Sequence, residues 1–422
     1  MNRHERRRRI LDALRKTPSA ALAPPDIYDP DDVAAMLREI GIALVEVAQP
    51  TSIVKDRLDL IAARYTTQRV RTVVLPTMLL IQIGREAYEI DGSTRSSLQL
   101  DAAGRIDHIA SLAEAGAITP TDAVVAVAAA RSRPPRFGKA ATITASAVTS
   151  VGFGMMINPT WASLPGYFFL GLVAGAILML SKPLPSLTPI LPTLAAFVVT
   201  LLASWFVVET ANDGLLRVIS PALVAAIPGM ALAVGATELA ASQIISGASR
   251  LVFGMSQLAL LVFGVIIGMH LAGPVAPQTP SSQMGSWSLY LAIIVVGLSL
   301  SVYLSAPPGS LFWLTAAIAV ALITQQLASI VIAPTHAGFL GAVMAVLFAN
   351  LATRIKTAPS AVVLIVASFW SLVPSTTSFM SVSQAATGGN GDISSLGQVG
   401  SAILSIALGT LVGWSIFRTI DG

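Results

Sequence analysis

The sequence predicts an α-helical polytopic membrane protein of about ten transmembrane helices with a small N-terminal cytoplasmic α/β domain. Two observations carry this prediction. Of the 422 residues, 54% are hydrophobic and 11% are charged, whereas a soluble globular domain has about 25% charged residues. The charges also gather at one end, because only six of the 26 Lys and Arg residues and five of the 22 Asp and Glu residues follow residue 139.

Composition excludes several classes of protein. A net charge of +4 does not indicate nucleic-acid binding, since cytoplasmic loops of inner-membrane proteins are expected to be positive. The absence of cysteine excludes disulfides and zinc–thiolate sites. The sequence has no P-loop and no dinucleotide fingerprint. We therefore expect no cofactor, no bound metal and no enzymatic activity.

Residues 1–29 predict a basic flexible arm, RHERRRRILDALRK followed by a Pro- and Ala-rich stretch. An alternative is a short amphipathic helix on anionic lipid. The basic run has no apolar segment of signal-peptide length after it, which argues against a cleaved signal.

Residues 30–139 predict the cytoplasmic α/β domain. Its apolar positions recur first at helical spacing and then in a β-branched, aliphatic stretch. The expected elements are a helix capped by Asp31 or Asp32, a helix capped by Ser52, strands in 69–83 broken at Pro76, a strand in 86–90, and helices in 101–114 and 119–131. His108 stands alone and is interpreted as a surface or half-buried histidine.

Ten apolar segments follow, each about long enough to cross a hydrocarbon core of ~30 Å. The expected spans are 140–157, 161–181, 188–208, 218–241, 251–272, 287–305, 309–332, 336–353, 360–380 and 398–418. Four cations between Arg131 and Lys139 place the N-terminal domain in the cytoplasm. With ten spans, five of the six later cations also fall on the cytoplasmic side, which predicts an inner-membrane protein with both termini inside.

The spans divide into two halves of five, 140–272 and 287–422, joined by an external loop at 273–286. An odd number of spans per half would give the halves inverted topology. Proline supports this weakly: the fourth span of each half begins near Pro221 or Pro359 and continues to Pro228 or Pro374.

The stretch from Val218 to Leu251 is the first candidate transport site. Pro228 and Gly229 interrupt an apolar span that also holds Glu238. A carboxylate at a helix centre costs roughly 2.5–3.5 kcal/mol on insertion scales and usually has a function. We expect Glu238 to bind a proton or a substrate ammonium, and the broken backbone to open around it. The alternatives are a buried structural acid and a kink that eases packing.

Further candidates lie at the cytoplasmic end of this stretch and in the ninth span. Arg250 is either a carboxylate-binding residue or a positive-inside anchor. The hydroxyl cluster of the ninth span either binds a substrate hydroxyl or packs helices through small residues. The full set of candidates is Glu238, Pro228, Gly229, Ser246, Gly247, Arg250, Trp370, Ser375 and Thr376.

The order Pro-Gly, acid-Leu, Ser-Gly and Arg-Leu in AAIPGMAL through ISGASRL resembles the threonine/serine exporter family of bacterial amino-acid exporters. The segments MLREIGIALVEVAQPTSIVKDRL and ITPTDAVVAVAAARSRPPRFGK add to the resemblance, which covers nearly the whole chain after the basic arm. It implies ten spans, a cytoplasmic N-terminal domain and proton-driven export of threonine and serine. The chain departs from the family pattern at Glu238, where Asp is usual, and at Val373-Pro374-Ser375, which lacks a glycine.

We therefore expect a proton-coupled antiporter that exports small hydroxyl amino acids. Its expected partners are the amino acid, protons and the lipid bilayer, and the sequence leaves homo-oligomerisation open. One alternative is export of a small dicarboxylate such as succinate. Others are a membrane-anchored hydrolase that uses the cytoplasmic domain, and a structural scaffold.

Overall fold

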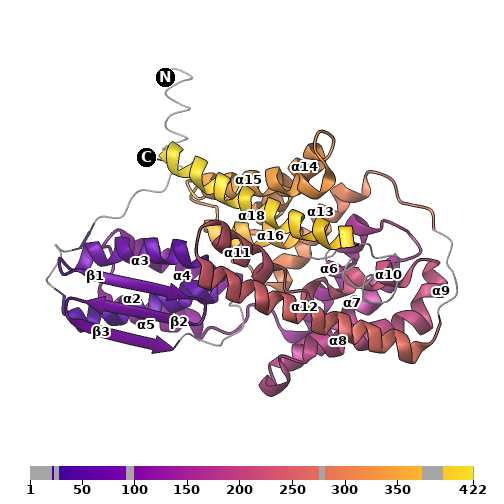
Figure 1. The fold of residues 1–422 in the computed structure, drawn as a ribbon, viewed down its shortest axis with the longest axis horizontal. Coiled ribbons are helices and arrows are strands. Elements are labelled where there is room, and N and C mark those ends of the chain that lie inside the picture. The colour runs from indigo at the N-terminus through magenta and orange to yellow at the C-terminus, as the bar shows by residue number, and fades with distance from the viewer. Residues whose placement is uncertain (1–20, 23–27, 92–98, 275–280, 373–392, 422) are drawn as a thin grey trace.

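The computed structural model describes residues 21–22, 28–91, 99–274, 281–372 and 393–421. The described elements before Lys139 form an N-terminal unit, residues 28–131, at one end of the molecule (Figure 1). Its sheet is antiparallel with the order β1-β2-β3. The elements are α2 (Pro30–Glu46), α3 (Thr51–Tyr65), β1 (Val70–Leu75), β2 (Met78–Ile83), β3 (Glu86–Asp91), α4 (Leu100–Glu114) and α5 (Pro120–Arg131).

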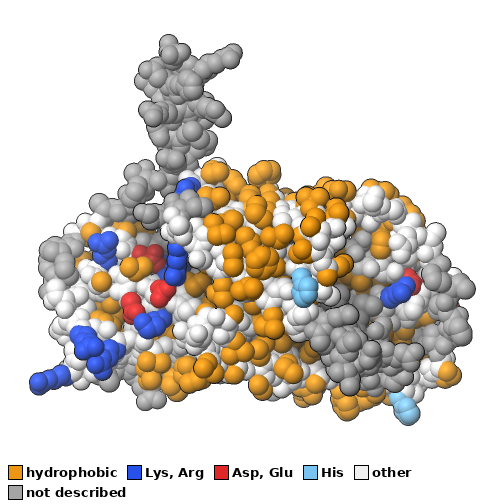
Figure 2. All heavy atoms as spheres, turned by 45° about the horizontal axis from the view of Figure 1, so that its top comes forward, with side chains coloured by type: hydrophobic (Ala, Val, Ile, Leu, Met, Phe, Trp, Pro, Cys, Tyr) orange, Lys and Arg blue, Asp and Glu red, His pale blue; other side chains and the backbone are white. Residues whose placement is uncertain are grey.

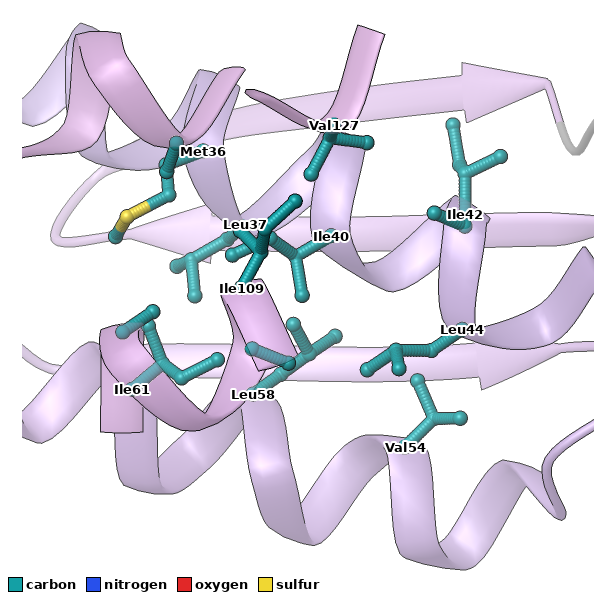
Figure 3. Close-up of a cluster of buried hydrophobic side chains, with 14 of the residues drawn as sticks. Met36, Leu37, Ile40, Ile42, Leu44, Val54, Leu58, Ile61, Ile109 and Val127 are labelled. Carbon is teal, nitrogen blue, oxygen red and sulfur yellow. The ribbon is translucent and has the colours of Figure 1, made fainter. Parts of the chain in front are cut away.

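Apolar side chains from all four helices of the N-terminal unit meet in one core (Figure 3). Met36 of α2, Leu58 of α3, Ile109 of α4 and Val127 of α5 are all buried in it. Because each helix has an apolar stripe at helical spacing, the four stripes can be buried together against the sheet.

Local sequence signals predicted some of the element ends in this unit and misplaced others. The Thr119 hydroxyl accepts from Asp122 N at 3.2 Å ahead of Pro120, as the cap-plus-proline pattern predicts. Strand β1 ends directly before Pro76, which cannot donate to the ladder. The first helix is capped by Asp29 rather than by Asp31 or Asp32, because Pro30 takes the first helical position.

Two arginines with little exposure tie the helices of this unit together. Arg57 pairs with Asp107 at 2.6 Å and with Glu114. Burial works to lower the pKa of Arg57, but the two carboxylates outweigh it, and the pKa is raised. Arg131 pairs with Glu46 at 2.7 Å, joining α5 to α2.

Helices make up the rest of the described chain. The elements are α6 (Lys139–Ile157), α7 (Leu164–Leu178), α8 (Leu191–Leu202), α9 (Val208–Ala211), α10 (Leu215–Leu223), α11 (Gly229–Ala240), α12 (Ile244–Ala272), α13 (Ser288–Tyr303), α14 (Leu311–Ala328), α15 (Pro334–Ala352), α16 (Ala361–Leu372) and α18 (Ile393–Asp421). A π-helical segment, Ala203–Val207, connects α8 to α9, so the two continue as one helix.

Within the described residues, seven of these helical segments are long and apolar enough to cross a membrane, or eight when the bent pair α10–α11 counts as one span. Helices α13 and α16 are apolar but shorter, with 16 and 12 residues. The chain is thus a polytopic helical membrane protein, and the number ten stays a prediction.

Loops gather at the two ends of the helical part. At the end facing the N-terminal unit, Leu100 N donates to Leu304 O at 3.0 Å, and Arg418 pairs with Asp56 at 2.9 Å. At the far end, Met284 N donates to Pro159 O at 2.7 Å. The segments 304–310 and 418–421 therefore lie on the side of the N-terminal unit, and 158–163 and 281–287 lie on the other side.

The surface of the helical part is apolar, as expected for a protein in a lipid bilayer. Figure 2 shows hydrophobic side chains spread over the helical part, whereas most of the visible charged side chains gather at the end of the N-terminal unit. Large apolar side chains such as Phe253, Phe312 and Val331 are more than half exposed. A contiguous apolar surface of this kind fits lipid rather than water.

Candidate functional site

The structure contains the helix break that the sequence predicted in the stretch 218–251, and Pro228 accounts for it. Helix α10 and its 3-10 extension run to Ala226, α11 begins at Gly229, and the two are bent by 69°. Pro228 lacks an N–H and forces the residue before it out of the helical region. Ile227 accordingly is extended, with φ −75° and ψ 131°.

Glu238 lies in the last turn of α11, two residues before its end, and is fully buried. Its Oε2 is 3.1 Å from Nε of Arg250, whose side chain is 15% exposed. Its Oε1 accepts a hydrogen bond of 2.8 Å from the backbone N–H of Thr51. The acid thus joins three elements: α11, α12 and the first residue of α3 in the N-terminal unit.

Several buried polar atoms around this acid have no hydrogen-bond partner among the described residues. They are Oε2 of Glu238, Nε and Nη2 of Arg250, and Oγ1 of Thr51, together with Oε1 of Gln49 two residues earlier. Arg250 and Glu238 are close enough to attract, but they are not aligned for a hydrogen bond. Unsatisfied groups of this kind are costly in a low-dielectric setting and often mark a functional site.

Glycines bring α11 and α12 close enough for this pairing. A Cβ at Gly247 would lie 2.6 Å from Leu239 N and 2.7 Å from Gly235 O. The neighbouring Ser246 of α12 is also buried. Of the predicted site residues, Gly247 therefore sets the spacing of the α11–α12 hairpin, and Glu238 and Arg250 meet across it.

Two cavities border α11. The smaller, of about 330 Å³, is lined by Pro228, Gly229 and Trp370, so the structure brings these three predicted residues together. The larger, of about 1190 Å³, lies between the N-terminal unit and the helices, and Val234 and Thr237 of α11 are in its wall. Pockets that bind small molecules usually measure about 300–1,000 Å³.

One prediction about the site was wrong. We expected Pro228 and Gly229 to open the backbone around Glu238, but α11 is continuous from Gly229 to Ala240. At 1.5 Å per residue, the break and the acid are roughly 14 Å apart along the helix. The break lines the smaller cavity, whereas Glu238 lies near the opposite end of α11. Ser375 and Thr376 lie outside the described residues.

The sequence also missed residues. We predicted Ser52 as a helix cap, but α3 begins at Thr51, and Pro50 at its N-cap offers no side-chain acceptor. The acceptor comes from Glu238, 187 positions later. At the far end, the buried Asp213 accepts a hydrogen bond from the Asn158 amide, lies 3.4 Å from the hydroxyls of Thr160 and Ser163, and pairs with Arg217 at 4.0 Å.

Apolar helices, a broken span and a buried ion pair beside cavities are typical of helical membrane transporters. Residues 35–272 match the family ThrE, described as "Putative threonine/serine exporter". The match covers more than half of the chain, so the chain belongs to this family of membrane exporters. It ends at the last residue of α12, so the helices from α13 onward lie outside it. Searches of the curated proteins and of the solved structures found no match.

Proposed function

We propose that this protein is a secondary transporter that exports threonine and serine across the inner membrane in exchange for protons. The observation that supports it most is the buried Glu238–Arg250 pair, 3.1 Å apart beside the larger cavity. Family membership supports export of an amino acid.

The pair suits a zwitterion because it carries one charge of each sign. An amino-acid ammonium can approach Oε2 of Glu238, and its carboxylate can approach Nη2 of Arg250, two atoms that lack hydrogen-bond partners among the described residues. Binding would then replace the Glu238–Arg250 ion pair by two ion pairs, one between Glu238 and the ammonium and one between Arg250 and the carboxylate. The net buried charge would change little. When the substrate leaves on the far side, Glu238 is the group that takes the returning proton.

The proposal includes ten spans with the N-terminal unit and the C-terminus in the cytoplasm. This orientation is supported by two contacts with the N-terminal unit, of Leu304 with Leu100 and of Arg418 with Asp56, because both lie in segments expected on the cytoplasmic side. In this proposal the larger cavity is the cytoplasmic entrance of the transporter, called the inner mouth below. The helix break, with Trp370 beside it, would hold the substrate between the inner mouth and the far end of the helices.

The test is uptake of labelled threonine, serine and succinate into inside-out vesicles, with an acidic lumen or without a gradient. We expect the acidic lumen to drive threonine and serine uptake and a protonophore to stop it. Uptake of succinate instead would show a dicarboxylate exporter. Uptake that ignores the gradient would refute proton coupling, and uptake of none of the three would refute the proposed function.

A further inference from the structure

The loop between α2 and α3, residues 47–50, lies at the point where the two cavities meet. Val47 and Ala48 line both cavities. Gln49 and Pro50 line the larger one. The N-terminal unit therefore forms part of the wall of the inner mouth rather than standing apart from it.

The residue that follows this loop, Thr51, contacts Glu238. The acid is 0% exposed and is absent from the walls of both cavities, although its neighbour Thr237 lines the larger one. Thr51, directly after the loop, is itself 1% exposed and donates its N–H to Glu238. No substrate can reach the carboxylate from the larger cavity unless this contact opens.

The two ends of the loop are held in different ways. Ala48 has a φ of 60°, the left-handed conformation that commonly follows a helix C-cap, and Gln49 N donates to Leu44 O at 3.3 Å to close the end of α2. The hydrogen bond from Thr51 N to Glu238 ties the other end of the loop to α11. Loss of the Thr51–Glu238 contact would therefore free that end of the loop.

We propose that residues 47–50 are the inner gate of the transporter and that the hydrogen bond from Thr51 N to Glu238 Oε1 is its latch. This inference rests on the transport function proposed above. When the hydrogen bond breaks and the loop moves, the carboxylate becomes accessible from the larger cavity. A primary ammonium bound to the exposed carboxylate then keeps the Thr51 N–H from returning, so the N-terminal unit couples occupancy of the site to opening of the inner mouth.

The latch can be removed with little other change. Thr51→Pro deletes the N–H at the first helical position, where proline is well tolerated. Pro50 already has φ −58° and ψ 138°, the extended conformation that a residue before proline requires. The matched control is Thr51→Val, which keeps the N–H and loses only the hydroxyl.

Accessibility gives the readout, since the chain has no cysteine of its own. Met230 lines both cavities, so Met230→Cys in the full chain reports on the inner mouth. We measure its labelling by a membrane-impermeant maleimide in inside-out vesicles without substrate. Thr51→Pro should raise the rate at least about tenfold, as expected for loss of a hydrogen bond to a charged group, and Thr51→Val should leave it unchanged.

Equal labelling rates for the Thr51→Pro and Thr51→Val proteins would refute the proposed gate. If Thr51→Pro does not fold, the double variant Glu238→Ala/Arg250→Ala removes the acceptor without leaving a buried charge. This double variant should raise the labelling rate of Met230→Cys by at least about tenfold, as expected for Thr51→Pro. A labelling rate equal to that of the Met230→Cys protein alone would refute the proposal. Because labelling needs no substrate, its outcome is separate from that of the threonine, serine and succinate assay.

Discussion

Glu238 is the residue on which most of the proposed chemistry depends. It has three possible roles: partner of Arg250, cap of α3 and carrier of a proton or ammonium. A purely structural acid would need only the first two. The transport role can be separated from these by a substitution that keeps the shape of the side chain.

Glu238→Gln should lower proton-driven threonine uptake by more than about tenfold, because the neutral amide takes up no proton, has no charge to attract an ammonium, and leaves Arg250 without its counter-ion. The matched control is Glu209→Gln, an exposed acid in the same half of the helical part. The double variant Glu238→Gln/Arg250→Gln should regain stability but not transport. Full proton-coupled uptake by Glu238→Gln would refute the assignment.

Tyr65 gives the N-terminal unit a predictable response to alkali. Its hydroxyl donates to Ile118 O at 2.6 Å, and burial raises its pKa to about 12. An unfolded tyrosine ionises near pH 10. Between these values the unfolded state loses a proton that the folded state keeps, so stability present below pH 10 is lost as the pH rises, by roughly 2–3 kcal/mol.

Tyr65→Phe should therefore cost about 1 kcal/mol at neutral pH, through loss of the hydrogen bond, and should flatten the fall in melting temperature of the full chain between about pH 10 and 12. The comparison is with Tyr290→Phe, which changes an exposed tyrosine. A Tyr65→Phe protein with the same alkaline fall as the unaltered chain would contradict this account.

At the scale of elements, the α11–α12 hairpin positions the ion pair, and it depends on glycine. Gly235 and Gly247 let the two backbones approach until Glu238 and Arg250 meet. This close approach resembles small-residue packing between membrane helices generally.

Gly247→Ala should force α11 and α12 apart, because its Cβ would meet backbone atoms of Leu239 and Gly235 that cannot turn away. We expect a loss of about 1–3 kcal/mol, seen as a lower melting temperature, together with loss of transport. Gly400→Ala is the control: it lies exposed in α18 with nothing near the added methyl group. It should be neutral or stabilising by up to about 1 kcal/mol. A Gly247→Ala protein as stable and active as Gly400→Ala would show that the hairpin tolerates a wider spacing.

The elements themselves were largely predictable from local signals. Proline placed the end of β1, the start of α5 and the break before α11, because it lacks an N–H and restricts its neighbours. The start of α3 was missed because its acceptor, Glu238, is remote in sequence.

At the scale of the whole molecule, loop contacts give the orientation a direct test. Ser286 lies in the exposed segment near Met284 at the far end, and Thr357 lies in the exposed segment between α15 and α16. In the cysteine-free chain, Ser286→Cys should react with an impermeant maleimide only in intact cells, and Thr357→Cys only in inside-out vesicles. Both sites reacting from the same side would refute the proposed topology.

By itself, the sequence determined the class of the protein and which of its residues could carry chemistry. Hydropathy and charge are local properties, and a membrane makes them decisive because the bilayer excludes charge and requires satisfied backbone groups. They therefore predicted a charged N-terminal part, a set of apolar helices and an unusual acid in a broken span, and the family match over residues 35–272 agrees.

Only the tertiary structure decided what the acid touches. The contacts of Glu238 with Arg250 and Thr51 depend on how α11 folds back on α12 and where the N-terminal unit lies. It also separated Glu238 from the break at Pro228 by the length of α11. Contacts between distant residues follow from the packing of whole helices, which no local pattern specifies.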